Sequence, residues 1–221
     1  MQNRISWQAD ISLDCAVPRV VEAFVELLGS AWDSIKDECS NNSSENEITD
    51  KIVSWMQVRL RSEGWWVYQQ AKPPRAKYDV GEKTYGFCDI TVQIRSKPII
   101  FECKRLNIYS GGRFASLATP YVKEGLHRFL FPYPQNGKRT PQYESLDGAS
   151  GMIGYVMDSA VGSAVCAVQK SLATYATPES QVYPNPPACP ATNSFRFLTT
   201  HSDCCNQRVT VHHILLPLSG D

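Results

Sequence analysis

The stretch FCDITVQIRSKPIIFECK (87–104) decides the fold of this 221-residue chain. Its two runs 87–94 and 98–104 are rich in β-branched and aromatic residues and flank a three-residue connection, which predicts a pair of antiparallel strands. Successive side chains of a strand point to opposite faces, so Glu102 and Lys104 leave the second strand on the same face. The expected hairpin therefore presents a carboxylate and an amine side by side.

The first strand of this hairpin contributes a second carboxylate. Asp89 lies on the face opposite to Ile90 and Val92, and antiparallel pairing brings it next to Glu102, at the ends away from the turn. Two carboxylates and a backbone carbonyl suit Mg²⁺, which keeps several waters and shares phosphate oxygens. A nearby lysine can orient or deprotonate a metal-bound water and offset charge in the transition state. The hairpin therefore predicts a site for phosphodiester hydrolysis.

Outward from the hairpin, the sequence alternates helical and strand-like segments. Apolar spacing predicts helices over 18–36, 47–62, 119–131 and 159–176, and strands over 64–70, 151–157, 194–200 and 208–218. This order is typical of an α/β protein with a mixed central sheet flanked by helices and an added N-terminal helix. We expect an N-terminal helical appendage over 1–40 and a main domain over 45–221, separated by the polar stretch CSNNSSEN (39–46).

The central residues follow a known pattern. Asp89, a gap of 12 residues and then Glu102-Cys103-Lys104 resembles the motif of the PD-(D/E)XK nuclease superfamily, although Cys88 stands where the literal motif has proline. The resemblance implies a restriction-endonuclease-like fold and a Mg²⁺ or Mn²⁺ cofactor. It implies that Asp89, Glu102 and the backbone carbonyl of Cys103 bind the metal, and that Lys104 serves the attacking water.

The same resemblance suggests one further acidic residue. Many members of the superfamily place a glutamate on the helix before the sheet, and Glu47 in NEITDKIVSW occupies a matching place in this chain. We therefore expect Glu47 among the catalytic and metal-binding residues, with Glu45 as the competing choice.

The charge distribution points to a nucleic-acid partner, although the net charge is zero. Residues 71–140 hold 13 Lys or Arg against 5 Asp or Glu, and a basic segment is the usual footprint of phosphate binding. DNA is the expected partner, with RNA as the alternative. The candidate phosphate contacts, each of which could instead lie on a solvated face, are Lys72, Arg75, Lys77, Arg105, Arg113, Lys123 and Arg128.

Several sequence features that would mark other classes of protein are absent from this sequence. It has no apolar run of membrane-spanning length and no signal peptide, so we expect a cytoplasmic protein that does not contact a membrane. Most of the eight cysteines are scattered, which favours reduced thiols over a disulfide framework or a zinc site. No phosphate-binding loop or serine-hydrolase elbow occurs, which argues against an NTP-driven motor or a serine hydrolase.

Two function classes follow. The first is a metal-dependent endonuclease, acting as a bacterial or phage defence or restriction effector whose protein partner supplies targeting or activation. The alternative is a catalytically inactive nucleic-acid-binding or scaffold subunit on the same fold. The apolar face of the N-terminal helix, with Phe24 and Leu28 at its centre, either packs on a second copy to form a homodimer or folds back onto its own domain.

Overall fold

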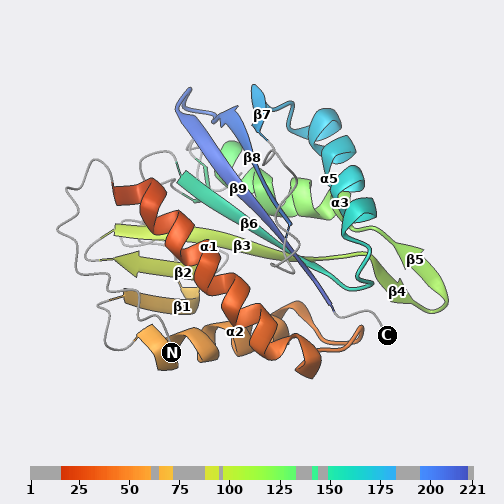
Figure 1. Ribbon diagram of the computed structural model, residues 1–221. Coiled ribbons are helices and arrows are strands. Elements are labelled where there is room, and N and C mark those ends of the chain that lie inside the picture. Colours follow the sequence, from red (N-terminus) through yellow and green to blue (C-terminus); the bar gives the residue numbers. More distant parts are fainter. Residues whose placement is uncertain are drawn as a thin grey trace, which may run out of the picture.

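A seven-stranded mixed sheet forms the centre of the computed structural model, which describes residues 16–60, 65–71, 88–94, 97–132, 141–143, 149–182 and 195–218 (Figure 1). The strand order is β1-β2-β3-β6-β9-β8-β7, with β3, β6 and β9 parallel and the other pairs antiparallel. The strands of this sheet are β1 (Trp65–Ala71), β2 (Cys88–Ile94), β3 (Lys97–Leu106), β6 (Ala149–Val156), β7 (Ser180–Val182), β8 (Phe195–Ser202) and β9 (Arg208–Pro217). The expected α/β class with a mixed sheet is confirmed.

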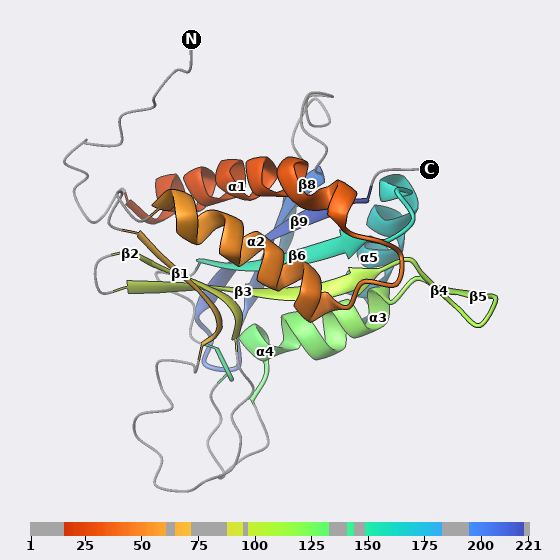
Figure 2. The same cartoon turned by 90° about the horizontal axis from the view of Figure 1, so that it is seen from below.

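Helices cover the two faces of this sheet (Figure 2). One hydrophobic core joins α1 and α2 to one face, and a second core joins α3, η4, α4 and α5 to the other. The helical segments are α1 (Ala16–Ile35), η2 (Lys36–Glu38), α2 (Glu45–Leu60), α3 (Ala118–Pro120), the π-helical η4 (Tyr121–Leu126), α4 (His127–Leu130) and α5 (Val161–Tyr175). None of the described helices combines the length and apolar character needed to cross a bilayer.

The N-terminal helix α1 belongs to the core of this chain. Phe24 and Leu28 are fully buried, and Phe24 packs on Phe101 of β3 with ring centroids 4.3 Å apart. Trp32 donates a hydrogen bond from its indole nitrogen to the carbonyl of Pro217, at 2.8 Å. The apolar face therefore folds back onto its own domain, which is one of the two arrangements expected from the sequence, and is not free to pair with a second copy.

Three short strands lie outside the segments in which the sequence predicts strands. The glycine pair 111–112 turns a hairpin between two of them, β4 (Ile108–Ser110) and β5 (Arg113–Ala115), and both glycines have positive φ, of 58° and 72°. Adjacent residues with positive φ are typical of two-residue hairpin turns, and glycine adopts them without steric cost. Strand β7 is the third of these short strands. Three residues at a sheet edge leave little periodic signal.

Candidate active site

Strands β2 and β3 pair as the expected hairpin over part of their length and separate at the end where the acidic residues lie. Strands β2 and β3 pair up to Ile90 opposite Phe101, and beyond this point β3 continues alongside β6. Where the strands separate, the Asp89 carboxylate replaces the partner strand and accepts a hydrogen bond from the Cys103 backbone nitrogen at 2.7 Å. The Cys103 carbonyl, in turn, accepts a hydrogen bond from the Lys104 ammonium at 2.7 Å. Both backbone polar groups of Cys103 therefore point into the site.

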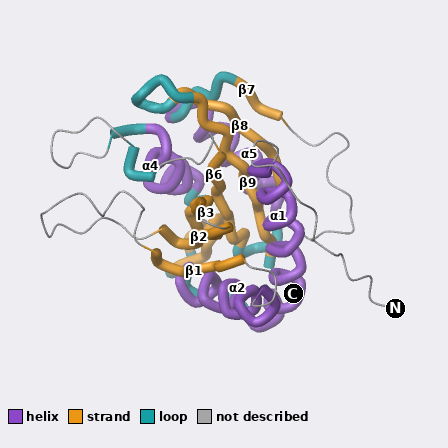
Figure 3. Tube along the Cα trace, turned by 90° about the vertical axis from the view of Figure 1, so that its left-hand side faces the viewer, coloured by secondary structure: helices purple, strands orange, loops and turns teal. Residues whose placement is uncertain are grey.

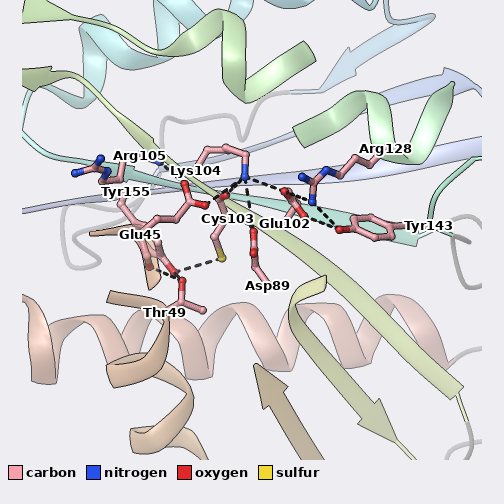
Figure 4. A network of polar contacts seen from close by, with 10 residues as sticks. All are labelled: Glu45, Thr49, Asp89, Glu102, Cys103, Lys104, Arg105, Arg128, Tyr143 and Tyr155. Carbon is pink, nitrogen blue, oxygen red and sulfur yellow. Dashed lines mark hydrogen bonds and ion pairs between the residues drawn. The ribbon is translucent and has the colours of Figure 1, made fainter. Parts of the chain in front are cut away.

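Three carboxylates from separate elements converge on Lys104 (Figure 4). Its Nζ lies 2.8 Å from Glu102 Oε1, 3.3 Å from Glu45 Oε1 and 3.9 Å from Asp89 Oδ2. Side-chain exposure is 0% for Glu102, 15% for Lys104, 16% for Asp89 and 28% for Glu45. The Glu102 side chain therefore lies at the buried bottom of the site, whereas Lys104, Asp89 and Glu45 are partly exposed to solvent.

The helix carboxylate at this site is Glu45, whereas the sequence led us to expect Glu47. Helix α2 begins at Glu45, so its first turn points this side chain at β3, where Glu45 Oε2 accepts a hydrogen bond from the Arg105 nitrogen at 3.2 Å. Glu47 forms a capping box instead: its carboxylate accepts from the Ser44 nitrogen at 2.6 Å, and its own nitrogen donates to Ser44 Oγ at 3.2 Å. The two-residue offset places Glu47 on a different side of the helix.

Arg128 and Tyr143 complete the cluster on the side of α4. Arg128 lies 2.8 Å from Glu102 Oε1 and donates to the Tyr143 hydroxyl at 2.8 Å. Tyr143, fully buried, donates to Glu102 Oε2 at 3.1 Å. Glu102 is thus bound on both oxygens. Sequence reasoning missed Tyr143 because its contact spans 41 residues and no motif surrounds it.

Burial governs the electrostatics of the cluster. Desolvation, reinforced by the nearby charge of Asp89, raises the pKa of Glu102 from 4.5 to about 7. Burial also raises the pKa of Asp89 and of Glu45, in both cases against the opposing effect of Lys104. For Lys104 burial alone lowers the pKa, but the three carboxylates outweigh it and raise the pKa well above its usual range. When fully ionised, the three acids exceed the two bases by one negative charge.

The donor chemistry fits a hard divalent cation. Carboxylate and carbonyl oxygens are the ligands that Mg²⁺ and Mn²⁺ prefer, and an excess of negative charge favours cation binding. In the described conformation the Lys104 ammonium bridges these oxygens, and within the described residues no group of three His, Cys, Asp or Glu side chains is spaced to hold an ion. Binding a cation therefore requires side-chain rotation around Lys104.

The other candidate nucleic-acid contacts are dispersed. Arg105 donates from its guanidinium to the Ser43 carbonyl at 3.2 Å, beside the cluster. Lys123 is exposed and lies 5.0 Å from the Tyr175 ring centroid, and Arg113 is exposed on β5. Lys72, Arg75 and Lys77 lie outside the described residues. Among the described members of the predicted set, only Arg128 reaches a carboxylate of the cluster with its guanidinium, whereas Arg105 reaches Glu45 with its backbone nitrogen.

His201 of β8 and His213 of β9 belong to a separate buried network. His213 shares hydrogen bonds with the Tyr121 hydroxyl at 3.0 Å and with Thr199 Oγ1 at 2.8 Å, and Thr199 Oγ1 also contacts His201 Nε2 at 2.8 Å. Burial lowers the pKa of His201 to about 4 and lowers the pKa of His213 well below its usual range. The two imidazoles therefore share Thr199 as a hydrogen-bond partner inside the core, away from the carboxylate cluster.

No family model, curated protein or solved structure matches this chain.

Proposed function

We propose that this chain is a divalent-metal-dependent nuclease with a restriction-endonuclease-like fold, which hydrolyses phosphodiester bonds, most readily in DNA. One observation carries the proposal. Asp89, Glu102 and Glu45 come from three separate elements and meet, together with the Cys103 carbonyl, around Lys104. A purely structural ion pair needs one acid for one base, whereas here three acids surround Lys104 and only Glu102 has Arg128 as a second basic partner. Desolvating this excess of acids is costly unless the site has a function.

The residues divide the chemistry between them. Asp89, Glu102 and the Cys103 carbonyl would hold Mg²⁺ or Mn²⁺, and Glu45 would bind it directly or through water. When bound, the ion would polarise the phosphoryl oxygen and lower the pKa of a coordinated water. Lys104 would orient the attacking water and offset the charge that develops on the phosphoryl oxygens.

Arg128 has the chemistry of a phosphate ligand. Its guanidinium already binds an oxyanion, the Glu102 carboxylate, and is 29% exposed. Planar guanidinium groups suit phosphate oxygens in the same way as carboxylates. We infer that Arg128 turns from Glu102 to the scissile phosphate when a cation takes over the neutralisation of Glu102.

Plasmid cleavage tests the proposal. Supercoiled DNA incubated with the protein and Mg²⁺ or Mn²⁺ should be nicked or cut, and EDTA, Glu102→Gln or Lys104→Ala should abolish the activity. Glu45→Gln should reduce cleavage strongly, whereas Glu47→Gln, a matched change two residues away, should leave cleavage intact. Equal activity in wild type and Glu102→Gln would refute the assignment, and equal losses in Glu45→Gln and Glu47→Gln would refute the role of Glu45.

A nucleic-acid-binding scaffold is the second candidate, favoured by one feature of the cluster. Lys104 and Arg128 both neutralise Glu102 without any metal ion. Calorimetric titration with Mn²⁺ separates the two functions, because a nuclease should bind the ion and lose that binding in Asp89→Asn. Retained DNA binding with no heat of Mn²⁺ binding would favour the scaffold.

The biological setting that we propose is that of a toxic effector in bacterial or phage defence, with a partner that supplies targeting. Induced expression of the wild-type chain should slow the growth of a bacterial host and damage its DNA. The Glu102→Gln variant, expressed to the same level, should not. Equal toxicity of the two proteins would contradict this setting while leaving the assay with purified protein to decide the chemistry.

A further inference from the structure

Strand β1 exposes two large aromatic side chains on one face. Trp66 is 61% exposed and Tyr68 is 39% exposed, whereas Val67 between them is 3% exposed and belongs to the core beneath α1 and α2. The alternation fixes the direction: Val67 points to the helices, and the two rings point to the opposite face. On that face the described segment α3–α4 lies against β3 and β6, away from β1 (Figures 2 and 3).

The two rings belong to the same face as the carboxylate cluster. Trp66 pairs with Gln93, and Tyr68 pairs with Thr91, so all four side chains share that face. Asp89 stands two residues beyond Thr91 on β2, and its carboxylate lies in the cluster described above. The rings, the two polar side chains and Asp89 therefore form a continuous path along the sheet, which ends at the proposed active site.

The floor of this path also contains an unsatisfied polar group. Thr91, directly opposite Tyr68, is 6% exposed, and its hydroxyl has no hydrogen-bond partner within the described part of the chain. Buried hydroxyl groups nearly always have a partner in the protein or in what binds to it. An exposed tryptophan beside an unsatisfied hydroxyl group is more typical of a binding surface than of a sheet edge that faces only water.

The spacing suits bases that are not paired. Same-face residues of a strand lie about 7 Å apart, so each ring can take one base on its own π-face. Stacking on protein rings requires bases whose faces are open, as in a single strand, whereas a duplex buries them. The surplus of Lys and Arg over Asp and Glu in residues 71–140 favours an anionic chain over a second copy of this protein, whose net charge is zero.

We propose that Trp66 and Tyr68 form a stacking platform for single-stranded nucleic acid, which runs along β1 and β2 to the carboxylate cluster. The platform itself is a binding site and stands whether or not the chain cuts. That it delivers a substrate strand for cleavage rests on the proposed nuclease function.

Binding without metal tests the platform separately from catalysis. A fluorescein-labelled oligothymidylate of about 20 nucleotides is titrated with wild-type protein in EDTA, and its anisotropy is recorded. Wild type should bind the single strand more tightly than the duplex formed with oligodeoxyadenylate. The double variant Trp66→Ala with Tyr68→Ala should lose about 100-fold in affinity for the single strand.

Two controls separate stacking from general adhesion. The β4–β5 hairpin carries Tyr109 and Phe114, which are 63% and 49% exposed, at the far end of β3 (Figure 1). Changing both to Ala should leave the affinity unchanged. Binding of the oligonucleotide should also quench tryptophan fluorescence in wild type, and most of this quenching should disappear in Trp66→Phe. The platform variant and the hairpin variant both alter exposed side chains, so each should have the melting temperature of the wild type in thermal denaturation.

Three results of the binding assay would overturn the platform: unchanged affinity in the Trp66→Ala, Tyr68→Ala variant, tighter binding of duplex than of single strand, or an equal loss in the hairpin variant. A dimer of the wild type that becomes a monomer in the platform variant, as measured by light scattering, would assign the rings to a second copy and also overturn it. Metal-dependent plasmid cleavage with unchanged single-strand binding in the platform variant would leave the nuclease standing and remove only the platform.

Discussion

The buried carboxyl group of Glu102 should make the protein less stable as the pH rises. Its side chain is fully buried, and its pKa of about 7 in the folded protein exceeds the value of 4.5 that an exposed glutamate has. The folded state therefore holds the proton more tightly than the unfolded state does. The sign follows: the stabilisation is complete below pH 4.5 and is lost as the pH rises to 7.

The magnitude follows from the same two pKa values. A difference of one pH unit in pKa corresponds to about 1.4 kcal/mol, so the interval from 4.5 to about 7 corresponds to about 3 kcal/mol in the free energy of unfolding. Most of this, about 2 to 3 kcal/mol, falls between pH 5 and pH 8. Glu102→Gln keeps the shape of the protonated side chain and removes the titration, so it isolates this contribution.

The assay is urea unfolding in EDTA, followed by tryptophan fluorescence at several pH values from 5 to 8. The stability of wild type minus that of Glu102→Gln should fall by about 2 to 3 kcal/mol across this range. Glu124→Gln, the same change at an exposed carboxyl group on η4, serves as the matched control for the substitution itself. Parallel profiles of wild type and Glu102→Gln would refute the reasoning, because they would mean that Glu102 ionises as easily in the folded as in the unfolded state.

Four further outcomes are expected. Saturating Mg²⁺ should flatten the wild-type pH profile, because a bound cation favours the ionised carboxylates, and a profile unaffected by Mg²⁺ would argue against a metal site. Tyr143→Phe removes a hydrogen bond to Glu102 and should move the apparent pKa of cleavage upward in a kcat/KM profile, with no shift refuting a positioning role for the hydroxyl. Gly151→Ala places a Cβ 1.9 Å from the Phe101 ring and should cost about 1 to 3 kcal/mol in thermal unfolding. Ser44→Ala breaks the capping box and should cost about 1 kcal/mol, whereas an unchanged melting temperature would discount that cap.

Most secondary structure was predictable because its signals are local. The period of apolar residues in 18–36 predicted α1, and the two β-branched runs around 95–97 predicted the β2–β3 hairpin, including the shared face of Glu102 and Lys104. Strand alternation and helix period depend on neighbours within a few residues, so one sequence suffices to recognise them. The short β7 strand was missed because it is too brief to show a period.

The identity of the helix carboxylate illustrates what one sequence leaves open. Glu45 and Glu47 differ by two positions, and the choice between them depends on where α2 begins and how it is rotated against β3. The Ser44–Glu47 capping box fixes that start. The motif S-x-x-E is visible in the sequence, and its recognition would have assigned Glu47 to the cap.

The sequence by itself determined the class of the fold, the acidic and basic residue types at its centre and the faces on which they lie, because all of these depend on local period. Only the tertiary structure decided that β2 separates from β3 at Asp89, that Tyr143 and Arg128 bind Glu102 across long stretches of chain, and that Glu102 is buried. The physical reason is that burial and convergence are properties of packed elements. The desolvation that raises the pKa of Glu102 arises only when the helices close over the sheet.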